Sequence, residues 1–360
     1  MSTPLTSEPP QTNKKSTESP QRPRPILMIP VRRCGSHALR LRLNFSDDFY
    51  SPYPLHIVEF MPLLPLYGNL ANDFNYFQLV IDVVGLQNAT MVKWDGVSLD
   101  PVAIFENIKD KPRSIHAITW EMLFVAGQQH RAKVVMDKSL DSVHYAEELI
   151  ELFDDMLFLH VARDPRAQIN SINRAIIHDF DILLNTLTWN KAQDAARALA
   201  EKYPDKVLTI RFEDFIQNQA VILQRVCTFF GIPFLDTMLD ISSSNEAQSL
   251  SGLSDLWATN SSAPIPANVD KFKKTLTLEE IQLIETLTAE HMSYYGYERM
   301  TQGATLITEA AIATAKEKSK KGKQAAWETM KVQDPQDYQL RKFRADYLAM
   351  LRQKLTPMAA

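Results

Sequence analysis

The sequence predicts an α/β fold in three layers, with a central, mainly parallel sheet between helices. Short apolar runs, each fitting one buried strand, alternate with longer stretches in which apolar residues recur at helical spacing. This alternation indicates a parallel sheet, because a helix returns the chain to the edge from which the previous strand started. The predicted strands lie at 26–29, 133–136, 156–161 and 207–210.

Helices are predicted after three of these strands. The helix after the fourth strand is expected to run unbroken from Glu213 to Phe229, and a later helix covers 278–291. The apolar positions are Ala38, Leu39, Leu41 and Leu43 after the first strand, Ile169, Ile172 and Ile176 after the third, and Phe215, Ile222, Val226 and Phe229 after the fourth.

Composition excludes several classes of protein. The 360 residues include 39 Lys and Arg against 43 Asp and Glu, giving a net charge of −4, with 45% hydrophobic residues. This balance excludes wholesale disorder and a generally basic nucleic-acid binder. Two cysteines, Cys34 and Cys227, are too few for a disulfide framework or a cysteine-built zinc site. No apolar stretch reaches the about 18 residues of a membrane span, so we expect a cytoplasmic protein without membrane contact.

The chain divides by composition into three parts. Residues 1–25 are rich in Pro, Ser, Thr, Gln and Lys and are expected to form a disordered tail. The main domain covers 26–298, and 299–360 form a helical C-terminal extension. Its Lys-rich part, 303–330, is expected to be a solvated helix face or a linker. A final apolar stripe docks on the protein's own surface or on a partner helix, which offers a contact for a homodimer; it comprises Leu340, Phe343, Tyr347 and Leu351.

The turn after the first strand has the features of an anion site. It reads Arg33-Cys34-Gly35-Ser36-His37-Ala38, with one glycine and a helix beginning at or near Ser36. Helix N-termini expose unpaired N–H groups and a partial positive charge, which suit a phosphate. The alternative is that Ser36 only caps the helix and the arginines are solvated. The Gly-x-x-x-x-Gly-Lys pattern of ATP-hydrolysing loops is absent.

A second turn follows the third strand. Arg163 ends that strand, and Pro165 suits the first turn of a helix because its missing N–H is no loss there. Ser171 follows about two helical turns later, so Arg163 and Ser171 could bind a second phosphate together. The alternative is a structural pair between Arg163 and Asp164, with Ser171 on the surface.

Together the two turns resemble the sulfotransferase family that uses 3'-phosphoadenosine 5'-phosphosulfate (PAPS). The family's first loop reads Arg/Lys-Ser-Gly-Ser/Thr-Thr, and its second motif places a serine eight residues after an arginine. The segments that correspond, in the same order, are Arg33-Cys34-Gly35-Ser36-His37, Asp137-Lys138-Ser139-Leu140, Arg163 with Ser171, Phe212-Glu213-Asp214-Phe215, and Val269-Asp270-Lys271-Phe272-Lys273 with Tyr295-Gly296-Tyr297.

This resemblance covers 26–298 and implies a P-loop-like fold and sulfuryl transfer from PAPS to a small-molecule acceptor, without a metal or nucleic acid. Cys34, His37 and Phe212 depart from the family's serine, threonine and tyrosine, which puts three side-chain contacts in doubt. The implied donor-binding residues are Arg33, Cys34, Gly35, Ser36, His37, Ala38, Arg163, Ser171, Phe212 and Lys271.

Sulfuryl transfer needs positive charge where negative charge develops, and a base for the acceptor's proton. By resemblance, Arg33 and Lys138 supply the charge. Glu59 is the candidate base, because burial among its apolar neighbours would raise its pKa; the alternative is a structural pair with an arginine. His56 and His116 are the other candidates, and His178, expected in a helix, needs no function.

Two other functions stay open at this point. One is a P-loop kinase or phosphotransferase, which shares the fold. The other is a non-catalytic relative that keeps the nucleotide site. The acceptor is expected to be a hydroxyl compound, less readily an amine, in a pocket lined by 45–130 and 250–268. No residue there identifies it.

Overall fold

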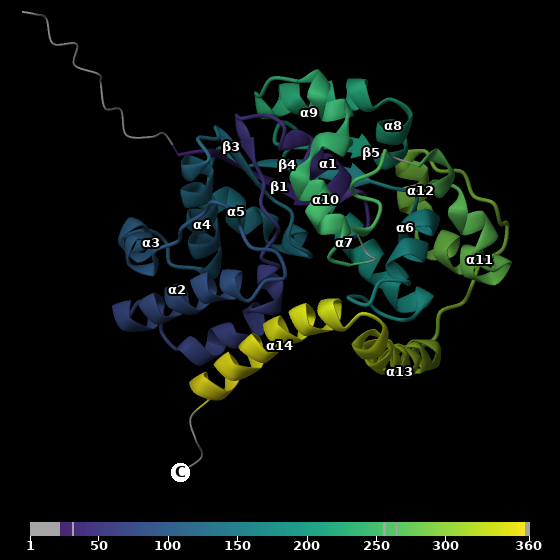
Figure 1. The fold of residues 1–360 in the computed structure, drawn as a ribbon. Helices are drawn as coiled ribbons and strands as arrows, with labels where there is room; N and C mark the ends of the chain where they lie inside the picture. The colour runs from purple at the N-terminus through teal and green to yellow at the C-terminus, as the bar shows by residue number, and fades with distance from the viewer. Residues whose placement is uncertain (1–21, 31, 255–256, 264, 357–360) are drawn as a thin grey trace, which may run out of the picture.

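The computed structural model describes residues 22–30, 32–254, 257–263 and 265–356. Within these residues a five-stranded parallel sheet forms the centre of the molecule, in the order β2-β3-β1-β4-β5 (Figure 1). The strands are β1 (Arg24–Ile29), β2 (Phe49–Tyr50), β3 (Val134–Asp137), β4 (Leu157–Ala162) and β5 (Val207–Arg211). The four predicted strands are therefore confirmed, while β2 is too short to produce a recognisable apolar run.

Both faces of the sheet are covered, which explains why its strands are largely apolar. In β1, Ile26 and Met28 pack on one side, in a core shared with α1 and α9. Leu27 and Ile29 pack on the other side, in a larger core that includes α2, α4 and α7. The three predicted layers are thus present.

The helices that form these layers follow the strands in sequence. The helices between the strands are α1 (Ser36–Leu43), α2 (Asp73–Asn88), α3 (Pro101–Ile108), α4 (Ile115–Gln129), α5 (Ala146–Leu152), α6 (Pro165–Ile172) and α7 (Ile182–Lys202). After β5 come α8 (Phe212–Gln217), α9 (Gln219–Phe230), α10 (Asn245–Ser251), α11 (Leu278–Leu287) and α12 (Ala289–Tyr295).

Two predicted helices are broken in the structure. The helix expected from Glu213 to Phe229 is split at Asn218, whose side chain accepts a hydrogen bond from the Val221 N–H and so caps α9. The helix expected over 278–291 is split at Thr288 into α11 and α12. The spacing of the apolar residues did not predict these breaks, because the apolar residues on both sides of each break keep one helical spacing.

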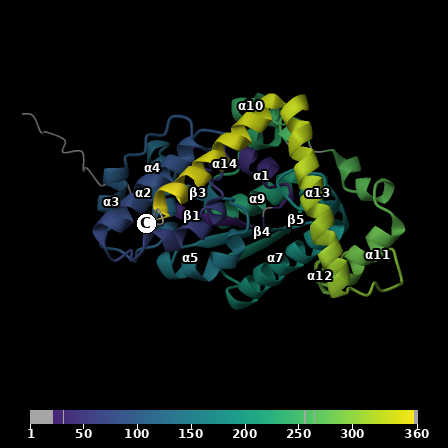
Figure 2. The same ribbon diagram turned by 90° about the horizontal axis from the view of Figure 1, so that it is seen from below.

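The C-terminal residues form two long helices, α13 (Glu309–Gln333) and α14 (Pro335–Leu355). They form a V across one face of the molecule (Figure 2). On α13, Ser319 donates a hydrogen bond to Asp179 in the segment before α7. On α14, Leu351 is buried in the main core and Tyr347 donates a hydrogen bond to the Asp82 carbonyl of α2. Tyr347 and Leu351 of the stripe therefore dock on the protein's own surface, whereas Phe343 is 59% exposed, and a homodimer contact stays a prediction.

The parallel sheet brings three loops to one edge. The chain leaves the carboxyl ends of β1, β3 and β4 toward α1, the 3₁₀ turn η3 (Ser142–Tyr145) and α6, respectively. Because these strands are neighbours in the sheet, their following loops lie together where α/β proteins bind ligands.

Candidate functional site

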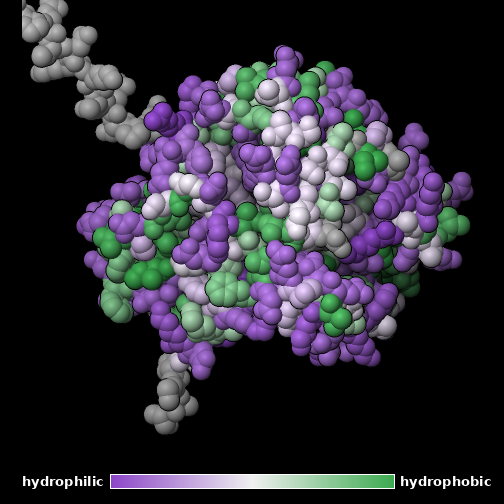
Figure 3. Space-filling model, in the orientation of Figure 1, coloured by the Kyte–Doolittle hydropathy of each residue, from purple (hydrophilic) through white to green (hydrophobic). Residues whose placement is uncertain are grey.

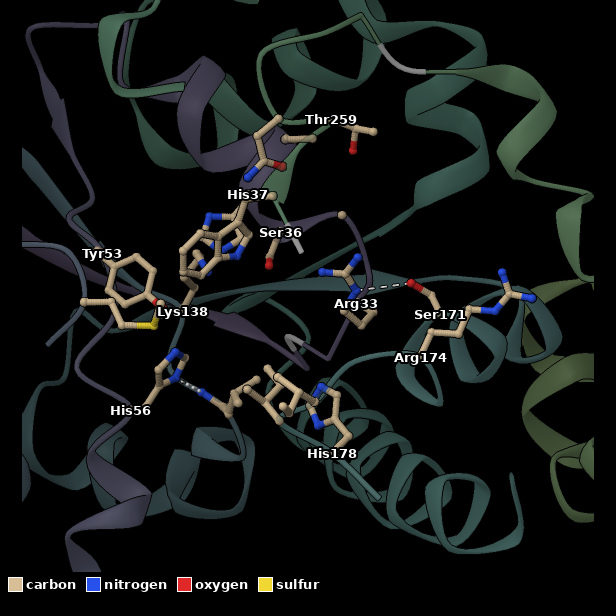
Figure 4. Close-up of a pocket in the computed structure, with 18 of the residues that line it drawn as sticks. Arg33, Ser36, His37, Tyr53, His56, Lys138, Ser171, Arg174, His178 and Thr259 are labelled. Atoms are coloured by element: carbon tan, nitrogen blue, oxygen red, sulfur yellow. Dashed lines mark hydrogen bonds between the residues drawn. The ribbon is translucent and has the colours of Figure 1, made fainter. Parts of the chain in front are cut away.

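A cavity of about 820 Å³ lies at this edge of the sheet. Figure 4 shows side chains from the three loops converging on it, and in Figure 3 apolar residues gather near the middle of this face, above α14. Glu59 is the acidic residue among its described lining residues. The basic residues that line it are Arg33, Arg42, Lys138, Arg163, Arg174, Lys271, Lys323, Arg341 and Arg344. The cavity is therefore suited to a ligand with several negative charges.

Gly35 shapes the first turn, as the N-cap of α1 with φ of 91°. A Cβ at this position would lie 2.2 Å from Cε2 of Phe212, so both the backbone conformation and the space require glycine. Ser36 begins α1 and lines the cavity, as predicted. Cys34 does not line the cavity, because its side chain points into the core beside β1. The side-chain contact that the sequence put in doubt at Cys34 is therefore not supported, and donor binding at this position stays a prediction.

Arg33 and Arg163 meet above this turn. The Arg33 Nε donates to the Ser171 hydroxyl at 3.1 Å (Figure 4). The Arg163 Nη1 donates to the Arg33 carbonyl at 2.7 Å. The Arg163 guanidinium also lies 4.6 Å above the Phe212 ring. Burial lowers the pKa of both arginines, and the Arg163 charge lowers that of Arg33 further. The structure thus brings together the two motifs that the sequence placed 130 residues apart.

Asp164 does not form the pair with Arg163 that was the alternative interpretation. Its carboxylate instead binds Arg166, with 2.7 Å between Oδ2 and Nη2, and Arg166 also binds the buried Glu285 at 2.6 Å. Pro165 begins α6 as predicted, and the Asp164 side chain caps that helix by accepting from the Arg166 N–H. Because Asp164 is paired with Arg166, it does not hold Arg163, whose side chain lines the cavity.

Lys138 follows β3 and lies buried beside the first turn. Its Nζ is 3.1 Å from Nε2 of His37. Burial, followed by repulsion from Arg40, lowers the pKa of Lys138 to about 7. Burial and then the Lys138 charge place the pKa of His37 well below its ordinary value. His37 is therefore neutral near pH 7 and Lys138 is about half charged, and a bound anion would favour the charged form of Lys138.

Glu59 lines the cavity, but its predicted burial is wrong. Its carboxylate is 51% exposed and forms an ion pair of 2.8 Å with Arg344. The reason is the short 3₁₀ turn η1 (Ile57–Glu59). At about three residues per turn, Ile57 and Phe60 share the inner side while Glu59 points away from the core. The ion pair with Arg344, rather than burial, therefore orients the Glu59 carboxylate.

His56 lies in the cavity wall with a left-handed backbone, at φ of 51°. Its Nδ1 accepts a hydrogen bond from the Leu140 N–H, and its own N–H donates to the Ser139 hydroxyl. Burial sets its pKa well below the ordinary value. The neutral ring therefore carries its proton on Nε2, which makes it a hydrogen-bond donor rather than a base.

His116 is outside the cavity lining, on α4. It lies 3.7 Å from Glu148 of α5. Burial lowers its pKa to about 4. The geometry therefore does not favour His116 as the base.

Several residues of the cavity wall were not predicted from the sequence. His178 lies between α6 and α7, not in a helix as predicted, and its Nδ1 is 2.6 Å from Arg32. Arg174 lies one turn beyond Ser171 and could have been found by extending that motif. Tyr53 and Trp257 come from the two regions expected to line the pocket, and Arg344 comes from α14. No local pattern marks these last three positions.

Comparison with known protein families shows the family of the chain. A family model described as "Sulfotransferase family" matches residues 25–236, which include both turns, Lys138 and Phe212. The chain belongs to this family. The sulfotransferase therefore transfers a sulfuryl group, and the kinase and the non-catalytic relative are no longer the leading alternatives.

Solved structures support the same fold. The sulfotransferase domain of the Synechococcus PCC 7002 olefin synthase is 23% identical, with a TM-score of 0.56 over 78% of this chain and 98% of that one. The sulfotransferase domain from the curacin biosynthetic pathway is 18% identical, with a TM-score of 0.53 over 78% and 99%. At these identities the likeness establishes the α/β architecture.

The described part of this sulfotransferase lacks two other kinds of feature. No helix there combines the length and apolar character needed to cross a membrane. Those residues also contain no group of three or more His, Cys, Asp or Glu side chains placed to hold a metal ion.

Proposed function

We propose that this sulfotransferase takes its sulfuryl group from PAPS. The turn from Arg33 to Ala38 binds the 5'-phosphosulfate, and Arg163 with Ser171 binds the 3'-phosphate. The observation that carries the proposal is the cluster of Arg33, Arg163 and Ser171 beside the N-terminus of α1. Lys271, exposed in the 3₁₀ turn η8 (Lys271–Lys274), adds a positive charge at the rim.

The residues fit a ligand with phosphates at both ends. Burying two guanidinium groups side by side is costly without a counter-charge, and the lowered pKa values of Arg33 and Arg163 express that cost. The Nε of Arg163 is buried without a protein hydrogen-bond partner. An anion would satisfy this donor and return both pKa values toward their ordinary range. Phe212 lacks a hydroxyl, so its role is to support Arg163 and close the space above Gly35.

The reaction is an in-line displacement at sulfur. The acceptor oxygen forms a bond to sulfur while the bond from sulfur to the bridging phosphate oxygen breaks, leaving 3',5'-adenosine bisphosphate (PAP). Arg33 and Lys138 stabilise the charge that develops on the bridging oxygen. Glu59 takes the proton of the acceptor hydroxyl. Once the donor's negative charge is bound, the pKa of Lys138 rises and its charged form becomes available for this role.

The acceptor half of the cavity suits a small molecule with a hydroxyl group, and an amine less well. Tyr53 and Trp257 pack edge to face, with 5.6 Å between ring centroids, and form one wall. Leu140 and Leu348 add apolar surface. We place the reaction in the cytoplasm, because both cysteines are free, buried thiols.

The proposal is tested by following sulfur from labelled PAPS. The purified protein is incubated with [³⁵S]PAPS and a panel of small hydroxyl compounds, and the products are separated and identified by mass spectrometry. We expect the label on an acceptor oxygen, with one PAP formed per product. Phosphorylation of an acceptor with ATP and Mg²⁺, without any sulfated product, would contradict it.

A further inference from the structure

Two arginines of the C-terminal extension, Arg341 and Arg344, line the cavity. Arg344 lies on α14 and is 285 residues from Glu59 in the sequence. Its guanidinium-bearing side chain is only 12% exposed. The family model ends at residue 236, so α14 is a part of this chain that the family match does not cover.

Arg344 binds three groups of one short segment. Its Nε donates to the Glu59 carboxylate at 2.8 Å, and its Nη2 donates to the carbonyls of Leu55 at 2.7 Å and His56 at 3.3 Å. A guanidinium presents its donors in a rigid planar fork. The segment from Leu55 to Glu59 is therefore held in one arrangement relative to α14.

The held segment contains a strained residue. A left-handed backbone is unfavourable for any residue with a Cβ, and it persists where the surroundings over-determine it. For His56 these surroundings are the Ser139 hydroxyl, the Leu140 N–H and Arg344. Strain held in this way at a cavity wall is typical of functional positions.

The anchors also fix the chemical form of His56. Because Leu140 donates to Nδ1, the neutral ring keeps its proton on Nε2, which is the nitrogen left for the cavity (Figure 4). Glu59, on the next turn, offers a proton acceptor to the same cavity. Arg344 thus holds both a hydrogen-bond donor, the His56 Nε2–H, and a proton acceptor, the Glu59 carboxylate, at the same cavity.

We infer that Arg344 is a positioning residue of the active site and that α14 completes its acceptor half. Arg344 holds the Glu59 carboxylate where it takes the acceptor's proton, and holds the His56 turn so that Nε2–H donates to a sulfuryl oxygen. This inference rests on the proposed function, since it assigns these groups to sulfuryl transfer.

The test measures the tautomer of His56 in the full chain. Protein labelled with ¹⁵N-histidine is studied by long-range ¹H–¹⁵N correlation at about pH 8, with the His56 signals assigned through His56→Gln. The variants are Arg344→Met, which removes the donors, and Arg344→Lys, which keeps the charge but loses the fork. Lys342→Met is the matched control, because Lys342 lies on α14 in an exposed pair with Asp346. PAP affinity is measured for each variant by calorimetry.

We expect a single Nε2–H tautomer in the wild type and in Lys342→Met, and a mixture of tautomers in both Arg344 variants. PAP affinity should stay unchanged, while kcat with an accepted hydroxyl compound falls by about 10- to 100-fold in the Arg344 variants. An unchanged His56 spectrum in Arg344→Met would overturn the inference. If that variant does not fold, an unchanged spectrum in Arg344→Lys overturns it instead. Failure of the wild type to bind PAP would overturn the proposed function. The His56 tautomer in the Arg344 variants would still show whether Arg344 positions His56.

Discussion

The two halves of the cavity are built in different ways. The donor half consists of two strand–turn–helix units. Arg163 follows β4 directly, Arg33 lies four residues after the end of β1, and Ser171 lies on α6. The acceptor half combines the 3₁₀ turn η1, the region around Trp257 and α14. Arg344 of α14 is 285 residues from Glu59 of η1 in the sequence. In the proposed function, the cations that bind the nucleotide are thus carried by loops at the sheet edge, and the acceptor meets elements packed around that edge.

This difference leads to separable effects of mutation. Changes in the donor half are expected to alter PAP affinity, because its cations face the nucleotide's phosphates. Changes in the acceptor half are expected to alter turnover while PAP affinity stays constant. Lys138 lies between the halves, beside His37.

The largest effect is expected at this boundary. Lys138→Ala should lower kcat by about 10²- to 10³-fold, because it removes a charge that stabilises the leaving oxygen. Turnover is measured as PAP formed from PAPS with an accepted hydroxyl compound. Lys133→Ala is the matched control, since Lys133 precedes the same strand and is exposed beside Asp48. A loss of less than about threefold in Lys138→Ala would remove Lys138 from the catalytic machinery.

In the acceptor half, Glu59→Gln should lower kcat by about 10²-fold, because the amide cannot take a proton. PAP affinity should not change, since the side chain is on the acceptor side and bound to Arg344. The same assay and PAP calorimetry check both parts. Glu106→Gln, an exposed carboxylate paired with Lys109, is the control. Full activity of Glu59→Gln would transfer the role of base to another group.

In the donor half, Arg163→Ala should weaken PAP binding by about 10²-fold, since a buried charge-assisted contact to phosphate is lost. Calorimetry measures the effect. Arg197→Ala, which removes an exposed cation from α7, should bind PAP like the wild type. Equal PAP affinity of Arg163→Ala and Arg197→Ala would break the division of the cavity into two halves.

Gly35→Ala tests the turn without touching a charge. The left-handed backbone and the contact with Phe212 should together destabilise the folded protein by about 1–3 kcal/mol. Gly252→Ala is the control, because its φ is ordinary and its nearest neighbour is 3.7 Å away. Denaturant unfolding and PAP calorimetry are the measurements. Equal stability of the two variants would show that the turn tolerates a side chain.

The smallest effect is expected in the pH dependence of PAP affinity, through Lys138 between the two halves of the cavity. The pKa of Lys138 is about 7 in the free protein, so its charge is lost as pH rises through 7. Bound PAP favours the charged form, so affinity should fall above pH 7 by at most about tenfold per pH unit. Lys138→Ala should lack this slope. An identical slope in Lys138→Ala would assign it to another group.

The donor half could be predicted from the sequence because its determinants are local. Gly35, Ser36, Pro165 and Ser171 occupy fixed positions relative to strands that their own apolar runs predict. Because β1 and β4 are parallel neighbours in the sheet, the loops after them carry Arg33 and Arg163 to the same cavity.

The acceptor half could not be predicted in the same way. The burial of Glu59 was wrong, because the sequence shows apolar neighbours but not which side of a 3₁₀ turn faces the core. Arg344 was not predicted, because its contacts depend on where α14 docks. That docking is set by Leu351 and Tyr347 against α2, which no local pattern specifies.

In the proposed function, the cluster of Arg33, Arg163 and Ser171 binds the two phosphate-bearing ends of PAPS. Calorimetric titration of the purified protein with PAP, and separately with ATP, tests this most directly. We expect micromolar binding of PAP and little binding of ATP, because Arg163 and Ser171 are proposed to bind a 3'-phosphate and the sequence lacks the Gly-x-x-x-x-Gly-Lys pattern of ATP-hydrolysing loops. Tight binding of ATP with none of PAP would contradict it.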